Sequence, residues 1–336
     1  TCLLVAVAIG AAVVPLATNV DRRAAHGTSG SVLSEALVVE SGAHLLVRGR
    51  DPYAVVLDDP ALRHRALSVR QRFPYLPAMA AFGLPRAWAG DGPMTDARVV
   101  FGLFALGAIL VGVTAVPGRL VPVGVLLLCA LPPGALALST GGDDIPVLAV
   151  LLLGVAFVME GRGWAAGVTA GTAMALKQLA WPVAVLLAWY LLRRDRQAGW
   201  RMVASAAAVV VPLVGPFALW HPGAFVDDTV RFPLGLTKIA TVAASPTVGR
   251  AVARLLPIGV VAATAAGIVA VVLLIGTTAW AQASVARVVC VAGVVLGVAV
   301  LAAPATRFGL LAYPLNLAAW SLLVATEQPA PRAAPT

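Results

Sequence analysis

The stretch Gly134–Glu160 reads GALALSTGGDDIPVLAVLLLGVAFVME. An acidic pair, Asp143 and Asp144, separates two runs that carry almost no charge. The second run is an uncharged helix candidate, and further apolar runs of about 18 residues follow along the chain, each long enough to cross a bilayer as a helix. The sequence therefore predicts an all-α integral membrane protein, built as a multi-span helical bundle.

The composition supports this class. Hydrophobic residues make up 60% of the chain and charged residues 12%, whereas soluble domains carry about 25% charged residues. The formal net charge of +9 does not indicate a nucleic-acid partner, because basic residues of membrane proteins mostly mark cytoplasmic loops and lipid headgroups. We expect membrane lipids as partners and no nucleic acid.

One polytopic domain over residues 1–326 is predicted, with a short disordered tail at 327–336. We expect about ten transmembrane helices, one of which, at 182–192, is short and borrows residues from its neighbours. Their approximate bounds are Cys2–Thr18, Ala97–Val116, Leu120–Leu138, Ile145–Met159, Trp164–Leu179, Pro182–Leu192, Met202–Leu219, Leu256–Trp280, Val288–Ala303 and Phe308–Thr326. Tyr75–Trp88 is short and broken by proline, which predicts a re-entrant or interfacial segment.

The basic loop Arg193–Arg201 holds four arginines and one aspartate, which indicates a cytoplasmic position in a cell membrane. Counting spans outward from it predicts two long external loops, 19–96 and 220–254. The same count places the short segments 139–144, 176–181 and 304–307 on the external face.

An amphipathic helix is predicted at 31–48 of the first external loop, lying on the membrane surface. Glu40, His44 and Arg48 follow one another at intervals of four residues, so they form a polar stripe. We interpret Glu40 as a solvated residue of this stripe. Glu35 lies on an apolar row of the helix, where desolvation is expected to raise its pKa.

Several motifs together resemble the GT-C glycosyltransferases, most closely the actinobacterial enzymes that depend on polyprenol-phosphate-mannose. The motifs are GAHLLVRGRDPY (42–53), FPYLPAMAAFGLP (73–85), GGDDIPVLAVLLLG (141–154), AGVTAGTAMALKQLAWPVAVLLAWYLLRR (166–194) and TRFGLLAYPLNLAAW (306–320). The resemblance implies a GT-C-like fold with an active site on the extracytoplasmic face. It also implies transfer of a mannose-like sugar or a pentose, with inversion, from a polyprenyl-phosphate donor to a lipid, glycan or protein acceptor.

The resemblance also implies an acidic base in the first external loop, commonly Asp, at a position that corresponds here to Glu35. Glycosyl transfer needs such a base to take the proton of the acceptor hydroxyl, and Asp21 is the second candidate for this role. It also needs cations to hold the leaving phosphate. We predict Lys177 and Arg307 for this task.

Four further residues are predicted to bind substrate. Arg231 and Lys238, in the second external loop, are additional phosphate ligands or else headgroup contacts. Asp144 is expected to orient a cation such as Lys177 or an acceptor hydroxyl. Asp143 is expected to cap the helix that follows.

We expect no cofactor and no metal site. The acidic doublets at 58–59, 143–144 and 227–228 leave a divalent cation as an alternative, but none is an Asp-x-Asp motif. Neither a P-loop nor a dinucleotide-binding glycine pattern is present.

Two other functions stay open: a transporter or flippase of lipid-linked sugars, and a non-catalytic scaffold that binds polyprenyl phosphate. Transporters typically show matched halves with broken helices, and we find no such halves here.

Overall fold

The computed structural model describes residues 6–7, 9–27, 32–57, 62–63, 65–130, 132–239, 242–256, 265, 267–269 and 284–327. These residues form helices and connecting turns, and the described part of the chain contains no named strand. One isolated parallel bridge joins Ala244 to Thr306. The predicted all-α class is therefore confirmed.

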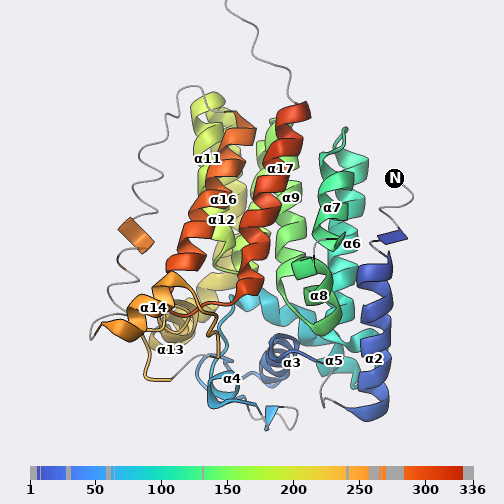
Figure 1. Cartoon of the computed structure of the whole chain (residues 1–336), viewed down its shortest axis with the longest axis vertical. Coiled ribbons are helices and arrows are strands. Elements are labelled where there is room, and N and C mark those ends of the chain that lie inside the picture. The colour runs from blue at the N-terminus through green and yellow to red at the C-terminus, as the bar shows by residue number, and fades with distance from the viewer. Residues whose placement is uncertain are drawn as a thin grey trace, which may run out of the picture.

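A bundle of long helices makes up most of the molecule, and its members run side by side (Figure 1). They are α6 (Ala97–Ala115), α7 (Leu120–Ala130), α9 (Asp144–Met159), α10 (Gly163–Leu176), α11 (Ala180–Arg194), α12 (Arg196–Trp220), α16 (Val285–Ala302) and α17 (Ala312–Glu327). Helix α9 forms the centre, because every residue from Ile145 to Val158 is buried. Beyond Asp144 in its first turn, the helix carries no charge and is apolar on every side, which suits a central position.

The remaining helices, most of them short, gather at one end of the bundle (Figure 1). They are α2 (Val14–His26), α3 (Ser34–Val47), α4 (Leu67–Gln71), η3 (Pro77–Gly83), α5 (Leu84–Ala89), α8 (Pro132–Thr140), α13 (Pro222–Val226), η5 (Asp227–Arg231) and α14 (Val248–Leu255). Three small elements complete the described chain: η1 (Ile9–Val13), η4 (Pro93–Thr95) and η7 (Phe308–Leu311). The segment predicted to be re-entrant or interfacial forms η3 and α5, which pack against α3.

The number of spans is not confirmed. Four described helical segments are long and apolar enough to cross a membrane, namely 97–115, 196–220, 285–302 and 308–327. A fifth is possible in the region predicted as one span at 120–138, where two helical pieces meet at 66°. Helices α9, α10 and α11 have 16, 14 and 15 residues. Most of the span predicted at 256–280, and the start of the first one, lie outside the described residues.

Hydrogen bonds connect segments that are distant in the sequence at each of the two ends of the bundle. At one end, the Arg119 N–H donates to Glu327 Oε1 at 2.5 Å, and Arg162 Nη1 donates to the Ala115 carbonyl at 2.9 Å. At the other end, three backbone bonds of 2.8–3.3 Å connect distant segments: 33 with 140, 76 with 176, and 245 with 306. The loops predicted to be external thus meet at one end. Which end faces outward stays a prediction.

Helix α3 differs from its predicted surface position. It packs against η3, α5 and α6, and its residues from 36 to 43 are all buried. Glu40 is not solvated: its carboxylate pairs with Arg23 at 2.6 Å and with Arg86 at 3.5 Å. The polar stripe was misread because a buried acid with cationic partners from other segments has the same sequence spacing as an exposed one.

A row of glycines brings α10 against α12. Gly163, Gly167 and Gly171 recur every four residues, so they lie on one face of α10. A Cβ atom at Gly167 would overlap Ser205 Oγ and the Met202 carbonyl on α12. Small residues at this spacing let helix backbones approach closely in membranes.

Candidate active site

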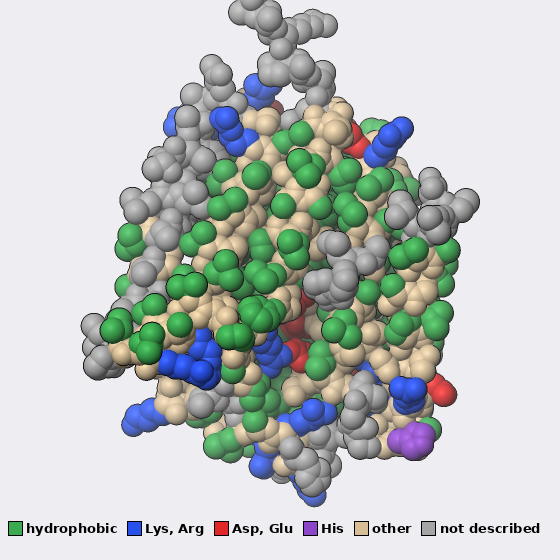
Figure 2. All heavy atoms as spheres, in the orientation of Figure 1, with side chains coloured by type: hydrophobic (Ala, Val, Ile, Leu, Met, Phe, Trp, Pro, Cys, Tyr) green, Lys and Arg blue, Asp and Glu red, His purple; other side chains and the backbone are tan. Residues whose placement is uncertain are grey.

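A pocket of about 760 Å³ lies between the end of the bundle and the layer of short helices. Its charged lining residues are Glu35, Arg72, Asp143, Asp144, Lys177 and Arg307, and its apolar walls come from α8, α16 and η7 together with the second predicted external loop. On the face in Figure 2, acidic and basic side chains are visible side by side in a recess surrounded by hydrophobic ones. An apolar pocket with a few convergent polar groups is the usual form of a ligand site.

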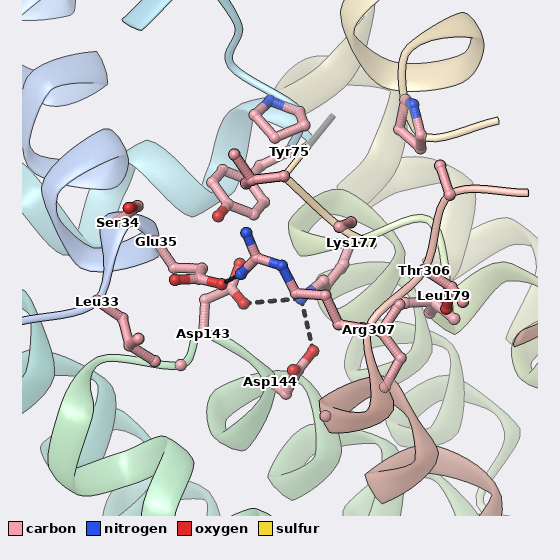
Figure 3. A pocket seen from close by; sticks show the side chains of 18 of the residues that line it. Leu33, Ser34, Glu35, Tyr75, Asp143, Asp144, Lys177, Leu179, Thr306 and Arg307 are labelled. Atoms are coloured by element: carbon pink, nitrogen blue, oxygen red, sulfur yellow. Dashed lines mark hydrogen bonds and ion pairs between the residues drawn. The ribbon is translucent and has the colours of Figure 1, made fainter. Parts of the chain in front are cut away.

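Lys177 joins the acidic pair at this pocket (Figure 3). Its Nζ atom lies 2.7 Å from Asp143 Oδ1, 2.5 Å from Asp144 Oδ1 and 5.8 Å from the centre of the Tyr75 ring. The chain leaves α10 at Lys177, whose backbone is extended (φ −152°, ψ 141°). The two aspartates stand at the start of α9. Two carboxylates therefore face one ammonium, and the cluster holds one more negative than positive charge.

The two glycines before the acidic pair make this arrangement possible. Gly141 has φ +112°, a conformation that disfavours any residue with a side chain. A Cβ atom at Gly141 would lie 2.9 Å from Ala36 Cβ on α3. The turn therefore presses against α3 and delivers Asp143 and Asp144 to the pocket. Asp143 was expected to cap α9, but its side chain makes no capping hydrogen bond there and accepts from Lys177 instead.

Glu35 and Arg307 form an ion pair across the pocket (Figure 3). Glu35 lies in the first turn of α3. Glu35 Oε2 is buried and has no hydrogen-bond partner among the described residues. Arg307 is held from both sides by Ser245, whose N–H donates to the Thr306 carbonyl at 3.0 Å and whose Oγ accepts from the Phe308 N–H at 3.1 Å.

Arg72 is a pocket residue that the sequence analysis missed. Its Nη1 donates to Asp228 Oδ1 at 2.6 Å, and the Phe73 N–H donates to Asp228 Oδ2 at 2.8 Å. Asp228 is fully buried, and this burial raises its pKa to about 6, against the effect of the two hydrogen bonds. In the sequence, only the acidic doublet at 227–228 marked this position. Its partners Arg72 and Phe73 lie 156 and 155 residues before Asp228, so no local pattern connects them to it.

Three of the predicted site residues do not join the pocket. Asp21, the second candidate for the base, is exposed on α2. Arg231 is exposed and pairs with Asp227 one helical turn away, at 2.7 Å. Lys238 is exposed as well. None of the three lines the pocket, so the structure offers no support for their predicted roles in catalysis or binding.

No metal centre is recognisable at the pocket in the part of the chain that the structure describes. Among the described residues, no group of three or more His, Cys, Asp or Glu side chains is arranged to hold a metal ion. The acidic doublet at 58–59 lies outside the described residues. The prediction that no metal is required is not tested by this observation.

A family model, Glycosyltransferase family 87, matches residues 73–304. The chain belongs to this family. A search of curated proteins and a search of solved structures found no match. The matched region includes Asp143, Asp144 and Lys177, whereas Glu35 lies well before its start and Arg307 lies just after its end.

Membership in family 87, together with apolar helices able to span a bilayer, identifies the chain as a membrane glycosyltransferase. Such an enzyme acts on a sugar donor and an acceptor. The pocket described above is the candidate active site, because it gathers three cations and three carboxylates from segments distant in the sequence. Perturbed and tightly paired ionisable groups in a cleft are typical of catalytic sites.

Proposed function

We propose that the protein transfers a mannose-like sugar or a pentose from a polyprenyl-phosphate donor to an extracytoplasmic lipid, glycan or protein acceptor. Glu35 is the general base, and Arg307 is the principal ligand of the donor phosphate. The observation that carries this proposal is the pocket itself, in which Glu35 and Arg307 lie side by side within apolar walls. A lipid-linked donor requires such walls for the first units of its chain.

The proposed reaction is a displacement with inversion at the anomeric carbon. The acceptor oxygen forms a bond to this carbon, and the bond between the carbon and the phosphate oxygen breaks. The electron pair of the broken bond leaves with the polyprenyl phosphate. The acceptor proton moves to Glu35, so the charge lost at the carboxylate equals the charge gained by the leaving phosphate.

The structure changes the role that we propose for Lys177. Its ammonium is already opposed by two carboxylates, so it has little positive charge left for a phosphate. We assign Lys177 to hold Asp143 and Asp144 in place. Asp143 Oδ2 is buried and lacks a hydrogen-bond partner among the described residues. A sugar hydroxyl, which can donate a hydrogen bond, is a suitable partner for it.

The test is transfer of label in membranes that contain the protein. Membranes are incubated with labelled polyprenyl-phosphate mannose or with labelled polyprenyl-phosphate arabinofuranose, and the products are separated from the donors. We expect label in a new lipid, glycan or protein product with one donor and none in membranes without the protein. Movement of intact donor across the bilayer without a product would favour the flippase alternative. Binding of donor without a product or movement would favour the scaffold.

A further inference from the structure

Lys177 and Arg307, the two cations predicted for the site, are held in different ways. Lys177 is 9% exposed and contacts two carboxylates. Arg307 is 38% exposed, and among the ion pairs between described residues it has Glu35 alone. Separating Lys177 from its partners would leave a buried acid, Asp143, and a largely buried one, Asp144, without a cation, which is costly. Separating Arg307 from Glu35 leaves one carboxylate without its cation, and the guanidinium is already partly exposed. The cost is correspondingly smaller.

Arg307 has unused capacity for an anion. A guanidinium offers five N–H donors and suits the oxygens of a phosphate. Burial lowers the pKa of Arg307, because desolvation disfavours the charged form of the side chain. Glu35, for its part, uses Oε1 for Arg307 and keeps Oε2 free of partners among the described residues.

The charges in the proposed reaction move between the same two positions. Before transfer, Glu35 carries one negative charge and the donor phosphodiester carries one. After transfer, Glu35 is neutral and the polyprenyl phosphate carries two. If Arg307 moves from the carboxylate of Glu35 to the donor phosphate, its positive charge follows the negative charge. It then stabilises the charge that develops on the phosphate in the transition state.

We propose that the donor phosphate displaces Glu35 from Arg307, so that the base is released only in a site that holds the donor. This inference rests on the proposed function and adds to it a coupling between donor binding and proton transfer. In the empty site Arg307 is paired with the carboxylate of Glu35. Once Arg307 turns to the phosphate, Glu35 loses its cation and becomes a stronger base for the acceptor hydroxyl.

The exchange predicts that Glu35 and a phosphate compete for Arg307, which can be measured without catalysis. The probe is undecaprenyl phosphate, which carries no sugar, and its binding is measured to the purified full chain in lipid nanodiscs. Glu35→Gln removes the competing charge and keeps the shape. We expect this variant to bind undecaprenyl phosphate about fivefold to tenfold more tightly than wild type. Undecaprenol, which lacks the phosphate, should bind both proteins equally.

Two controls separate competition from a general change in charge. Asp227→Asn removes an equal charge from a partly exposed residue that does not line the pocket, and it should not change the affinity. In an Arg307→Gln background, adding Glu35→Gln should no longer increase affinity, because the contested cation is gone. Glu35→Ala should reproduce the gain if Glu35→Gln does not fold.

The results also separate this inference from the function on which it rests. Equal or weaker binding of undecaprenyl phosphate by Glu35→Gln, with normal binding by wild type, would overturn the exchange alone. Wild type that binds undecaprenol as tightly as undecaprenyl phosphate would overturn the proposed donor class as well.

Discussion

Lys177 Nζ lies 2.7 Å from Asp143 Oδ1 and joins the end of α10 to the start of α9, with both side chains almost fully buried. Helix α9 is the central helix of the bundle. The pair therefore connects the candidate site to the core. We expect its loss to lower the stability of the fold, apart from any effect on the reaction.

Lys177→Met is expected to lower the free energy of unfolding by about 3–5 kcal/mol, because the buried Asp143 and the largely buried Asp144 lose their cation. The measurement is the thermal unfolding of the purified protein in detergent. Lys238→Met, at an exposed residue away from the pocket, is the control and should leave the melting temperature unchanged. Adding Asp143→Asn to Lys177→Met should restore part of the loss. An unaltered melting temperature in Lys177→Met would show that the ammonium is not needed to hold the acids.

The close contact of α10 with α12 gives a second prediction. Gly167→Ala places a Cβ atom where Ser205 Oγ and the Met202 carbonyl now lie, so the helices must separate. We expect a loss of about 1–3 kcal/mol in unfolding free energy. Gly215→Ala, on α12, is the matched control, because no heavy atom lies within 4 Å of its Cβ position. Equal melting temperatures for the two variants would contradict the packing described.

Asp228 gives a prediction about pH. Burial raises its pKa from 3.8 to about 6, so folding favours the protonated carboxyl. The resulting stabilisation is complete below about pH 4 and is lost as the pH rises through about 6. It amounts to about 3 kcal/mol. Asp228→Asn cannot titrate, and we expect wild type to lose this stability relative to the variant across that interval.

The measurement for Asp228 is the melting temperature of both proteins at several pH values across this interval. Curves that stay parallel would show that the carboxyl does not titrate there. Wild type that gains stability relative to Asp228→Asn as the pH rises would mean that the hydrogen bond from Arg72 outweighs burial.

The long apolar helices were predictable because hydrophobic length is a local property of the sequence. The predicted bounds of α6 and α9 agree with the structure to within one residue. The bend between α7 and α8 was not foreseen. In an apolar run that contains consecutive prolines, proline removes a backbone donor and bends the helix, but hydropathy alone does not register this.

The candidate site was partly predictable. Glu35, Lys177 and Arg307 stood out as isolated charges next to apolar runs, and the structure brings them to one pocket. The sequence did not reveal how the charges pair. Glu40 has the spacing of an exposed residue but pairs with Arg23, and Asp228 takes its partner from a distant loop. Pairing between distant segments depends on tertiary packing, which no local pattern encodes.

The orientation of the protein in the membrane can be tested by labelling. The basic residues of Arg193–Arg201 predict a cytoplasmic position. Cysteines introduced at Gln197 and at Lys238, both exposed, should react with a membrane-impermeant thiol reagent from opposite sides of the membrane. The protein must first have its native cysteines replaced, since Cys290 is exposed. Labelling of both positions from the same side would overturn the predicted orientation.

The identity of the base is the most direct test of the proposed chemistry. Glu35 lies in the pocket beside Arg307, whereas Asp21 is exposed on α2 and lines no part of it. Glu35→Gln keeps the shape of the side chain but removes the proton acceptor, so turnover should fall roughly 10²–10⁴-fold. Asp21→Asn should retain the turnover of wild type. Transfer of label from the polyprenyl-phosphate donor measures both.

The donor should still bind to Glu35→Gln, which separates a lost base from a lost binding site. An active Glu35→Gln combined with an inactive Asp21→Asn would move the catalytic role to Asp21 and place the reaction outside the pocket described here.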